Sequence, residues 1–281
     1  MLLPTQHHPR RFGTLRYVYP AMSRRSGGLS LGINLSPSGL CNFSCVYCQI
    51  LAAGTAKTGD QFVQIDVLNE ELRRLVESVN SGALFEHWLP QIPPEKRMLK
   101  DIAFSGDGEP TLSPQFAETV RIVADIRKKF CDNSVKIVLI TNASTLHLAP
   151  VCSALENMLQ HNGEIWAKLD AGTPDFFRTV SRSSIPFQTI CSNLTRFTQD
   201  FPVVIQTCFL ALHGLEPSTE EIRQYAERLN ELGKIVYVQI YTVARNTPEV
   251  WATPLDNNRL DSIAETVRQL TGRRVQTFYA Q

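Results

Sequence analysis

Three cysteines stand close together in this sequence, and their spacing could support metal chemistry. Cys41, Cys45 and Cys48 form the pattern C-x3-C-x2-C. Thiolates at this spacing can converge on a 4Fe-4S cluster, binding three irons and leaving the fourth open to a small molecule, whereas four cysteines close a cluster and suit electron transfer. Because no fourth cysteine stands nearby, the pattern predicts an open-site cluster with Cys41, Cys45 and Cys48 as the metal ligands.

A zinc site and a chance grouping are the alternative explanations of this triplet. Structural zinc usually takes four ligands from C-x2-C pairs or an H-x3-5-H pattern, and no such partner stands near the three cysteines. An odd total of seven cysteines does not suit a disulfide framework and favours a metal site in a reducing compartment. The remaining cysteines are scattered, as small buried apolar side chains would be, so one cluster is predicted: Cys131, Cys152, Cys191 and Cys208.

Strand-like and helix-like segments alternate along the chain. The strand-like segments are Ser30 to Leu35, Asp101 to Ser105, Val135 to Thr141, Glu164 to Leu169, Val203 to Leu210 and Ile235 to Tyr241. The helix-like segments are Val67 to Val79, Pro114 to Phe130, Leu148 to Gln160, Pro174 to Val180, Phe187 to Thr198 and Ser218 to Leu232. This alternation predicts an α/β fold of parallel βαβ units, a partial (β/α)6 TIM-type barrel, with 281 residues in one main domain.

The unusual polar segments follow the first four predicted strands. These segments are Pro37 to Cys48, Gly106 to Pro110, Asn142 to Ser144 and Asp170 to Gly172. In such barrels, function is carried by the loops at the carboxyl ends of the strands. The cysteines therefore stand where an active site is expected. A helix-like segment from Asp256 to Leu270 and a strand-like segment from Arg274 to Tyr279 are expected to cover an edge or the bottom of the barrel.

The cysteine motif in its context resembles the signature of the radical SAM superfamily. Tyr47 stands immediately before the last cysteine, as an aromatic residue does in that signature. Ser105 to Pro110 resembles the "GGE" motif of the family, with an Asp inserted between the glycines. Further blocks resemble the radical SAM proteins grouped with wyosine-type tRNA modification enzymes, many of which have unknown substrates: Ser23 to Leu35, Lys168 to Gly172 and Val238 to Arg245.

This resemblance implies a fold of the radical SAM type and a specific activity. One 4Fe-4S cluster would bind S-adenosylmethionine (SAM) and cleave it to methionine and a 5'-deoxyadenosyl radical, which would abstract hydrogen from an unidentified substrate. In such enzymes the protein places the radical against one substrate hydrogen and excludes water. The resemblance further implies an electron donor such as flavodoxin or ferredoxin.

The resemblance also implies which residues bind SAM. Tyr47 would lie near adenine, and the main chain of the glycine-containing loop would reach the ammonium group, because glycines allow close backbone approach. Asn142 and Ser144 resemble residues that contact the ribose or the carboxylate. Asp170 has a similar location, and a helix-capping or loop residue is its alternative. The loop residues concerned are Gly106, Asp107, Gly108 and Glu109, for which an ordinary turn is the alternative.

Three other polar side chains are candidates with simple alternatives. Arg182 carries a fork that suits the carboxylate of methionine, but it would equally suit the protein surface. Gln206 and Gln239 stand within apolar runs, where a buried amide must find partners. They are expected either to contact substrate or to pair across the barrel.

Charge is uneven although the formal net charge is only +1. Six basic residues precede the first acidic residue, Asp60. This stretch either forms a solvated arm by chance or surrounds an anionic cluster and ligand with positive potential. We predict a basic extension over residues 1–28, a radical SAM barrel over 29–245 and a C-terminal extension over 246–281.

Two other functions remain compatible with the sequence. The first is tRNA-base modification, for which the near-neutral composition provides a basic stretch only near the amino terminus. The second is a non-catalytic iron-sulfur or metal-binding protein, which would need the cysteines but not the SAM loops. No run of about 18 apolar residues and no apolar leader occurs, so a cytoplasmic protein without a membrane span is expected.

Overall fold

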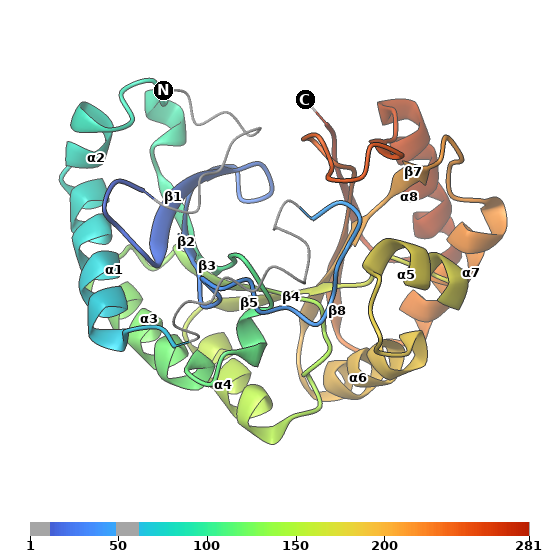
Figure 1. Cartoon of the computed structure of the whole chain (residues 1–281), viewed down its shortest axis with the longest axis horizontal. Helices are drawn as coiled ribbons and strands as arrows, with labels where there is room; N and C mark the ends of the chain where they lie inside the picture. Colours follow the sequence, from blue (N-terminus) through green and yellow to red (C-terminus); the bar gives the residue numbers. More distant parts are fainter. Residues whose placement is uncertain (1–11, 49–61, 281) are drawn as a thin grey trace. The chain divides into compact units, whose positions relative to one another are not determined.

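The structure is a computed structural model that describes residues 12–48 and 62–280 (Figure 1). Contacts divide the described residues into two compact units. The first unit contains residues 12–41, 62–140 and 148–164, and the second contains residues 42–48, 141–147 and 165–280. Cys41 therefore ends a segment of the first unit, whereas Cys45 and Cys48 belong to the second. The three predicted domain ranges stay a prediction.

Parallel strands form the centre of the first unit. Its strands are β1 (Val18–Ser23), β2 (Gly28–Ile33), β3 (Leu99–Phe104) and β4 (Lys136–Thr141). β1 pairs antiparallel with β2, whereas β2, β3 and β4 pair in parallel. Every residue of β2 is buried, as expected for a parallel strand that is covered on both faces. The carboxyl ends of β2 and β3 consequently lie at the same edge.

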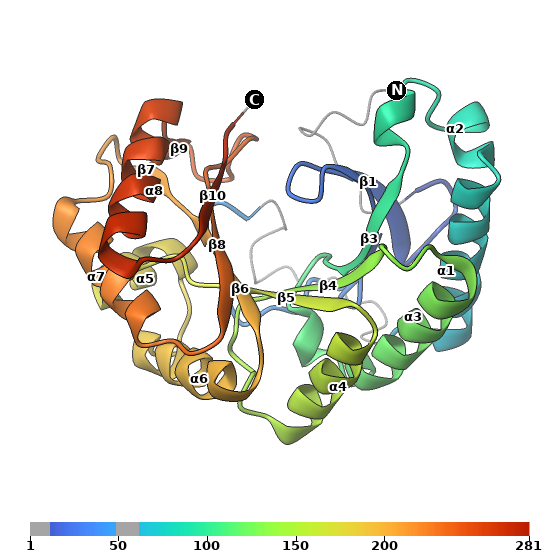
Figure 2. The same ribbon diagram turned by 180° about the vertical axis from the view of Figure 1, so that it is seen from behind.

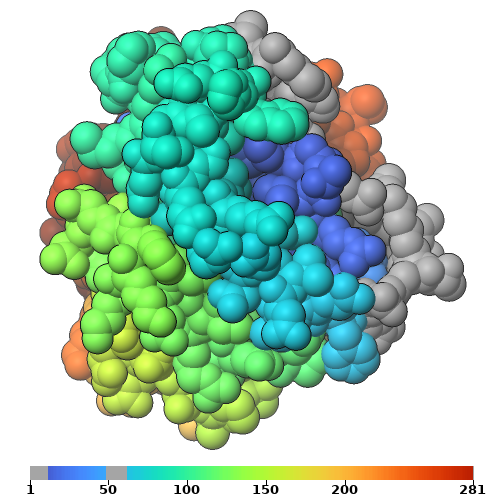
Figure 3. All heavy atoms as spheres, turned by 90° about the vertical axis from the view of Figure 1, so that its left-hand side faces the viewer, coloured from blue at the N-terminus to red at the C-terminus, as the bar shows by residue number. Residues whose placement is uncertain are grey.

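Helices cover the strands of the first unit. They are α1 (Ile65–Asn80), α2 (Ala83–His87), α3 (Phe116–Phe130) and α4 (Ala149–Gln160), with short 3-10 turns at Pro94–Lys96 and Pro110–Leu112. In α1, Leu68, Leu72 and Leu75 recur at helical spacing and are buried. Figure 3 shows α1 in cyan and α3 in green on the outer face of this unit.

The second unit repeats this design. Its parallel strands are β5 (Gly163–Lys168), β6 (Val203–Cys208), β8 (Ile235–Tyr241) and β10 (Val275–Phe278). Its helices are α5 (Pro174–Ser181), α6 (Phe187–Asp200), α7 (Thr219–Asn230) and α8 (Asn257–Thr271). Figure 2 shows α7 and α8 beside β8 and β10. Two short strands, β7 (Leu210–Leu212) and β9 (Ala252–Pro254), pair antiparallel.

Every strand and helix predicted from the sequence is present, with small differences at the ends. The predicted tail strand is β10, which pairs with β8 and so covers the edge of that strand. Ser218 caps α7, because its Oγ accepts a hydrogen bond of 3.1 Å from the Glu221 amide, whereas the Glu221 carboxylate accepts from the Gly172 amide and the Thr173 hydroxyl. Among the described helices, none is long and apolar enough to cross a membrane.

The sequence did not predict β1, α2, β7 or β9. β1 contains Pro20, which lacks an amide hydrogen and is tolerated in strands chiefly at edges. Its neighbour Tyr19 lies directly over Gly32 of β2, where a Cβ atom would stand 2.2 Å from the tyrosine ring. A cross-strand fit of this kind depends on tertiary packing, so alternation along a single segment does not reveal it.

Candidate functional site

The cysteine loop, defined here as residues 42–48 of the second unit, is tied to the end of α5. The Ser44 amide donates to the Ser181 carbonyl and the Val46 amide donates to the Val180 carbonyl, each over 2.9 Å. The Cys48 amide donates to the Cys45 carbonyl over 2.9 Å and closes a turn. The main chain around two of the three predicted ligands is thus fixed by hydrogen bonds.

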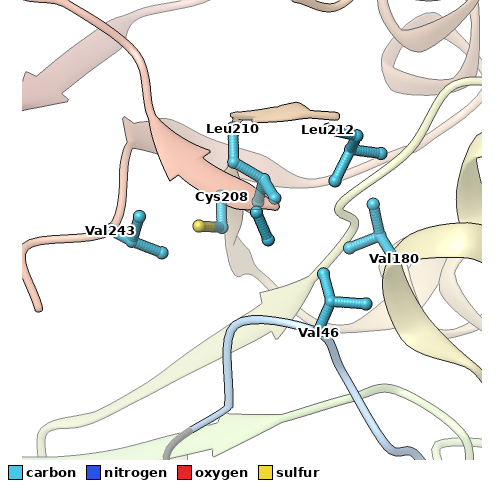
Figure 4. Packing of buried hydrophobic residues seen from close by; sticks show 7 residues of the cluster. Val46, Val180, Cys208, Leu210, Leu212 and Val243 are labelled. Atoms are coloured by element: carbon cyan, nitrogen blue, oxygen red, sulfur yellow. The ribbon is translucent and has the colours of Figure 1, made fainter. Parts of the chain in front are cut away.

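Val46 anchors the same loop through its side chain. It is 1% exposed and points toward Val180 in Figure 4. The two valines belong to an apolar cluster that also contains Cys208, Leu210, Leu212, Val243 and Ala252. Burying a valine side chain contributes about 1.5–3 kcal/mol. Apolar burial at position 46 therefore holds the loop while its neighbours Cys45 and Cys48 stay partly exposed.

The donor set fits an open-site cluster. Cys41, Cys45 and Cys48 are half-buried thiols that form no disulfide. Across residues 12–48 and 62–280, no three His, Cys, Asp or Glu side chains are grouped as they would be around a bound metal ion. The three cysteine side chains of the motif nevertheless match the chemistry that such a cluster requires. Cluster binding stays a prediction from the motif.

Asn42 joins the cysteine loop to two predicted SAM contacts. Its Nδ2 donates to Ser144 Oγ over 2.8 Å, and its Oδ1 accepts from Asn142 Nδ2 over 2.7 Å. The peptide between these two residues is fixed as well, because Asn193 Nδ2 donates to the carbonyls of Ala143 and Ser144 over 3.1 and 3.0 Å. Within the second unit, the structure thus brings Asn142 and Ser144 against the cysteine loop.

Tyr47 and Asp170 are a second pair of predicted SAM contacts that the structure brings together. The Tyr47 hydroxyl donates to Asp170 Oδ2 over 2.5 Å. Burial and the neighbouring Asp170 carboxylate raise the pKa of Tyr47 well above its ordinary value. The phenol is therefore neutral and stays a hydrogen-bond donor. This contact places Tyr47 at the carboxyl end of β5.

A buried lysine stands beside this pair. Lys168 Nζ lies 2.9 Å from Asp170 Oδ1, and it donates to the Tyr241 hydroxyl over 2.5 Å. Burial alone would lower the pKa of Lys168. The attraction of the Asp170 carboxylate raises this pKa by more than burial lowers it, so the net pKa lies above the ordinary value. Lys168 is therefore an ammonium ion, positioned where the carboxyl ends of β5 and β8 meet the cysteine loop.

The predicted glycine-containing loop of the first unit is organised by Asn34. Asn34 Oδ1 accepts from the Asp107 amide over 3.1 Å, and Asn34 Nδ2 donates to Asp107 Oδ2 over 2.8 Å. A Cβ atom at Gly106 would stand 2.4 Å from Asn34 Oδ1. Only glycine fits at position 106, because Asn34, the residue that follows β2, approaches its main chain closely.

Gly108 and Glu109 contact the residue that precedes Cys41. A Cβ atom at Gly108 would stand 2.0 Å from the Leu40 carbonyl oxygen, and the Glu109 amide donates to that oxygen over 3.0 Å. The Glu109 side chain is 3% exposed and accepts from the hydroxyl of Thr111 over 2.6 Å. The predicted SAM loop thus fixes the chain where it enters the cysteine motif.

Arg182 and the two glutamines have partners within the second unit. Arg182 Nη1 lies 2.6 Å from Glu249 Oε1, and its guanidinium lies 5.5 Å from the centre of the Trp251 ring. With a side chain 40% exposed, Arg182 is paired on the protein itself. Gln206 Nε2 donates to Gln239 Oε1 over 2.9 Å, so of the two expected alternatives the structure shows pairing, between the adjacent strands β6 and β8 and not across the barrel.

Sequence reasoning missed three of the residues that organise these contacts: Asn34, Asn42 and Lys168. Each stands within a segment that was singled out for other residues. Asn42 carries the clearest signal, because its amide side chain, immediately after a ligand cysteine, offers both a donor and an acceptor to neighbouring loops. Lys168 gives no local signal, since a lysine at a strand end is ordinarily solvated.

Comparisons with known proteins bear on this site. No family model matches the chain. It is 25% identical over 264 residues to a protein named GTPase Obg from Brachyspira hyodysenteriae, covering 93% of this chain and 35% of that protein. It is 23% identical over 228 residues to a UPF0026 protein from Helicobacter pylori, covering 80% of this chain and 65% of the relative. The chain thus spans less than two thirds of both. This chain contains no G-x-x-x-x-G-K-[ST] pattern, the P-loop motif that binds nucleotide phosphates.

Three solved structures share the fold at low sequence identity. A radical SAM methyltransferase from Sphaerobacter thermophilus has a TM-score of 0.64 at 14% identity, covering 92% of this chain and 68% of that one. TYW1 with a lysine-pyruvate adduct bound has a TM-score of 0.54 at 16% identity, covering 87% and 74%. Streptococcus suis SuiB bound to S-adenosylmethionine has a TM-score of 0.55 at 12% identity, covering 92% and 49%. The chain shares the α/β partial-barrel fold of these structures, which confirms the fold class predicted from its sequence.

Proposed function

We propose that this chain is a radical SAM enzyme that acts on a substrate still to be identified. One observation carries the proposal: the C-x3-C-x2-C motif follows the first parallel strand of a fold shared with radical SAM enzymes. Neither the motif nor the fold would be sufficient alone, because triplets of cysteines occur by chance and one fold can support many functions.

Cys41, Cys45 and Cys48 would hold a 4Fe-4S cluster by three thiolates. When bound, such a cluster supplies one electron for the cleavage of SAM to methionine and a 5'-deoxyadenosyl radical. The residues of this chain would orient the reactants. The buried Val46 and the neutral Tyr47 hold the loop in place. Gly106 and Gly108 allow their loop to pack closely against Asn34 and Leu40, and main-chain atoms of this loop would reach the ammonium group of SAM.

Metal analysis and SAM binding test this proposal together. Anaerobically reconstituted protein is expected to hold about four irons per chain and to bind SAM in a calorimetric titration. Replacing each of Cys41, Cys45 and Cys48 by serine is expected to abolish both. Cys131→Ser and Cys152→Ser are matched controls, because these half-buried thiols stand outside the motif.

Two results would count against the proposal. The first is full iron content in the triple serine variant, which would place the metal elsewhere. The second is wild-type protein with a complete cluster that does not bind SAM, which would favour a non-catalytic iron-sulfur protein. Iron clearly above four per chain would contradict the prediction of a single cluster.

Modification of tRNA is the second candidate. Similarity of fold to TYW1 and the basic residues that precede Asp60 favour it. Phosphate contacts dominate nucleic-acid affinity and make it depend on salt. Retention of tRNA that weakens as salt rises would support this candidate, whereas no retention at low salt would remove it.

A further inference from the structure

Lys168 brings a positive charge into the interior of the second unit. Its side chain is 12% exposed, and its partner Asp170 is 9% exposed. The ammonium group lies 5.2 Å from the centre of the Tyr47 ring and 4.7 Å from the centre of the Tyr241 ring. Two aromatic rings, one carboxylate and one hydroxyl therefore surround a single cation. Each of these contacts is favourable to an ammonium ion.

Asp170 connects three segments that are distant in the sequence. One oxygen accepts from the Tyr47 hydroxyl of the cysteine loop over 2.5 Å. The other oxygen contacts Lys168 at the end of β5 and accepts from the Cys208 amide at the end of β6 over 2.7 Å. The carboxylate thus receives donors from the loop and from two adjacent strand ends. Because Lys168 also donates to the Tyr241 hydroxyl, the end of β8 is linked to the same group of residues.

This arrangement depends on the charge of Lys168. A buried carboxylate without its cation would be strongly destabilised, and it would take up a proton or move toward solvent. In either case, the short contact between Asp170 and the Tyr47 hydroxyl would be lost or weakened. Tyr47 stands between two predicted ligands, so its displacement would also release Cys45 and Cys48.

We propose that Lys168 is a positioning residue: through Asp170, its buried ammonium fixes Tyr47 and so holds the cysteine loop against the ends of β5, β6 and β8. The relevance of this role to a cluster rests on the proposed function, but the role itself is a property of the protein without metal. A positioning role also distinguishes Lys168 from a nucleophilic lysine. A nucleophilic lysine must be neutral to react, whereas the Asp170 carboxylate keeps the Lys168 amine protonated.

Cysteine labelling of the metal-free protein tests the role without any need for activity. Wild-type and Lys168→Met proteins would be treated anaerobically with iodoacetamide, and the rate at each cysteine would be read by peptide mass spectrometry. Cys45 and Cys48 are expected to react about fivefold faster or more in the variant, because local opening of the loop exposes them. Lys136→Met is the matched control, since it removes a surface ion pair with Glu164.

Two other thiols report whether the variant is folded. Burial raises the pKa of both Cys131 and Cys191 to about 11, so both are expected to react slowly in folded protein. Faster labelling at Cys45 and Cys48 with unchanged Cys191 supports the role of Lys168. Unchanged rates at all positions overturn it.

If Lys168→Met also accelerates Cys191, the variant is unfolded and Tyr47→Phe decides. That change removes the hydroxyl that joins the cysteine loop to Asp170 and keeps the ion pair between Lys168 and Asp170. Selective acceleration at Cys45 and Cys48 then supports the role, and wild-type rates overturn it. Iron analysis of the wild type distinguishes the two proposals, because a protein that binds no iron could still show this labelling pattern.

Discussion

The hydroxyl of Tyr47 donates a 2.5 Å hydrogen bond to the carboxylate of Asp170. Tyr47 stands between two predicted cluster ligands, and Asp170 stands just after a parallel strand 123 residues further along the chain. The contact therefore transfers the rigidity of the sheet to a loop that has no regular secondary structure. Binding sites are often built in this way, with loops positioned by a rigid scaffold.

Loss of this hydroxyl is expected to destabilise the protein. Tyr47→Phe would leave one oxygen of the buried Asp170 carboxylate without its donor, which costs about 1–3 kcal/mol. Tyr279→Phe is the matched control, because it removes a 2.8 Å hydrogen bond to Asp261 at the surface and should cost less than about 0.5 kcal/mol. Urea unfolding of the two metal-free variants would compare these costs. Equal costs would show that the Tyr47 contact has no special weight.

Gly108 is expected to tolerate no side chain. Gly108→Ala would place a Cβ atom 2.0 Å from the Leu40 carbonyl oxygen and displace the chain just before Cys41. Overpacking of this kind costs about 1–3 kcal/mol, and iron content after reconstitution is expected to fall with it. Gly272→Ala is the control. Its added Cβ atom would have no neighbour within 4 Å, so the change brings only the backbone strain of a side chain at a φ of 66°. Normal iron content in Gly108→Ala would contradict the assigned role of this loop.

Asp101 is expected to make stability depend on pH. Burial raises its pKa above the ordinary 3.8, despite hydrogen bonds from Ser26 and Ser30. The folded state therefore binds this proton more tightly, and the resulting stabilisation is complete below pH 3.8 and is lost as pH rises through the folded pKa. The unfolding free energy of wild type minus that of Asp101→Asn should thus fall between acid and neutral pH.

Asp132 provides a control of opposite sign for that experiment. Hydrogen bonds from Ser134 lower its pKa, so its contribution to stability is present above pH 3.8 and is lost as pH falls through the lower folded pKa. The difference between wild type and Asp132→Asn should therefore rise with pH. Urea unfolding at several pH values measures both differences. A difference for Asp101→Asn that rises with pH would contradict the effect assigned to burial.

The sequence was sufficient to place the chemically important segments on the fold. Strands such as β3 and β6 are short apolar runs, and helices such as α7 carry their own capping signals. Both kinds of signal are local, so they can be recognised without the tertiary structure. For the same reason, the loops after β2, β3, β4 and β5 could be identified as the candidate site.

The partners within that site could not be predicted. Lys168 and Tyr241 are 73 residues apart and meet only because β5 and β8 both pair with β6. Arg182 was expected to bind a carboxylate, and the structure pairs it with Glu249, a carboxylate of the protein itself. Such pairings follow from register and packing between elements, which residue types alone do not specify.

Formation of 5'-deoxyadenosine is the most direct test of the central claim. Reconstituted protein, a strong reductant and SAM would be incubated anaerobically, and the product would be quantified by liquid chromatography and mass spectrometry. The claim predicts 5'-deoxyadenosine and methionine in equal amounts from wild type and Cys131→Ser, and neither from Cys41→Ser, Cys45→Ser or Cys48→Ser. A wild-type protein with a complete cluster and bound SAM that forms no 5'-deoxyadenosine under reduction would contradict it.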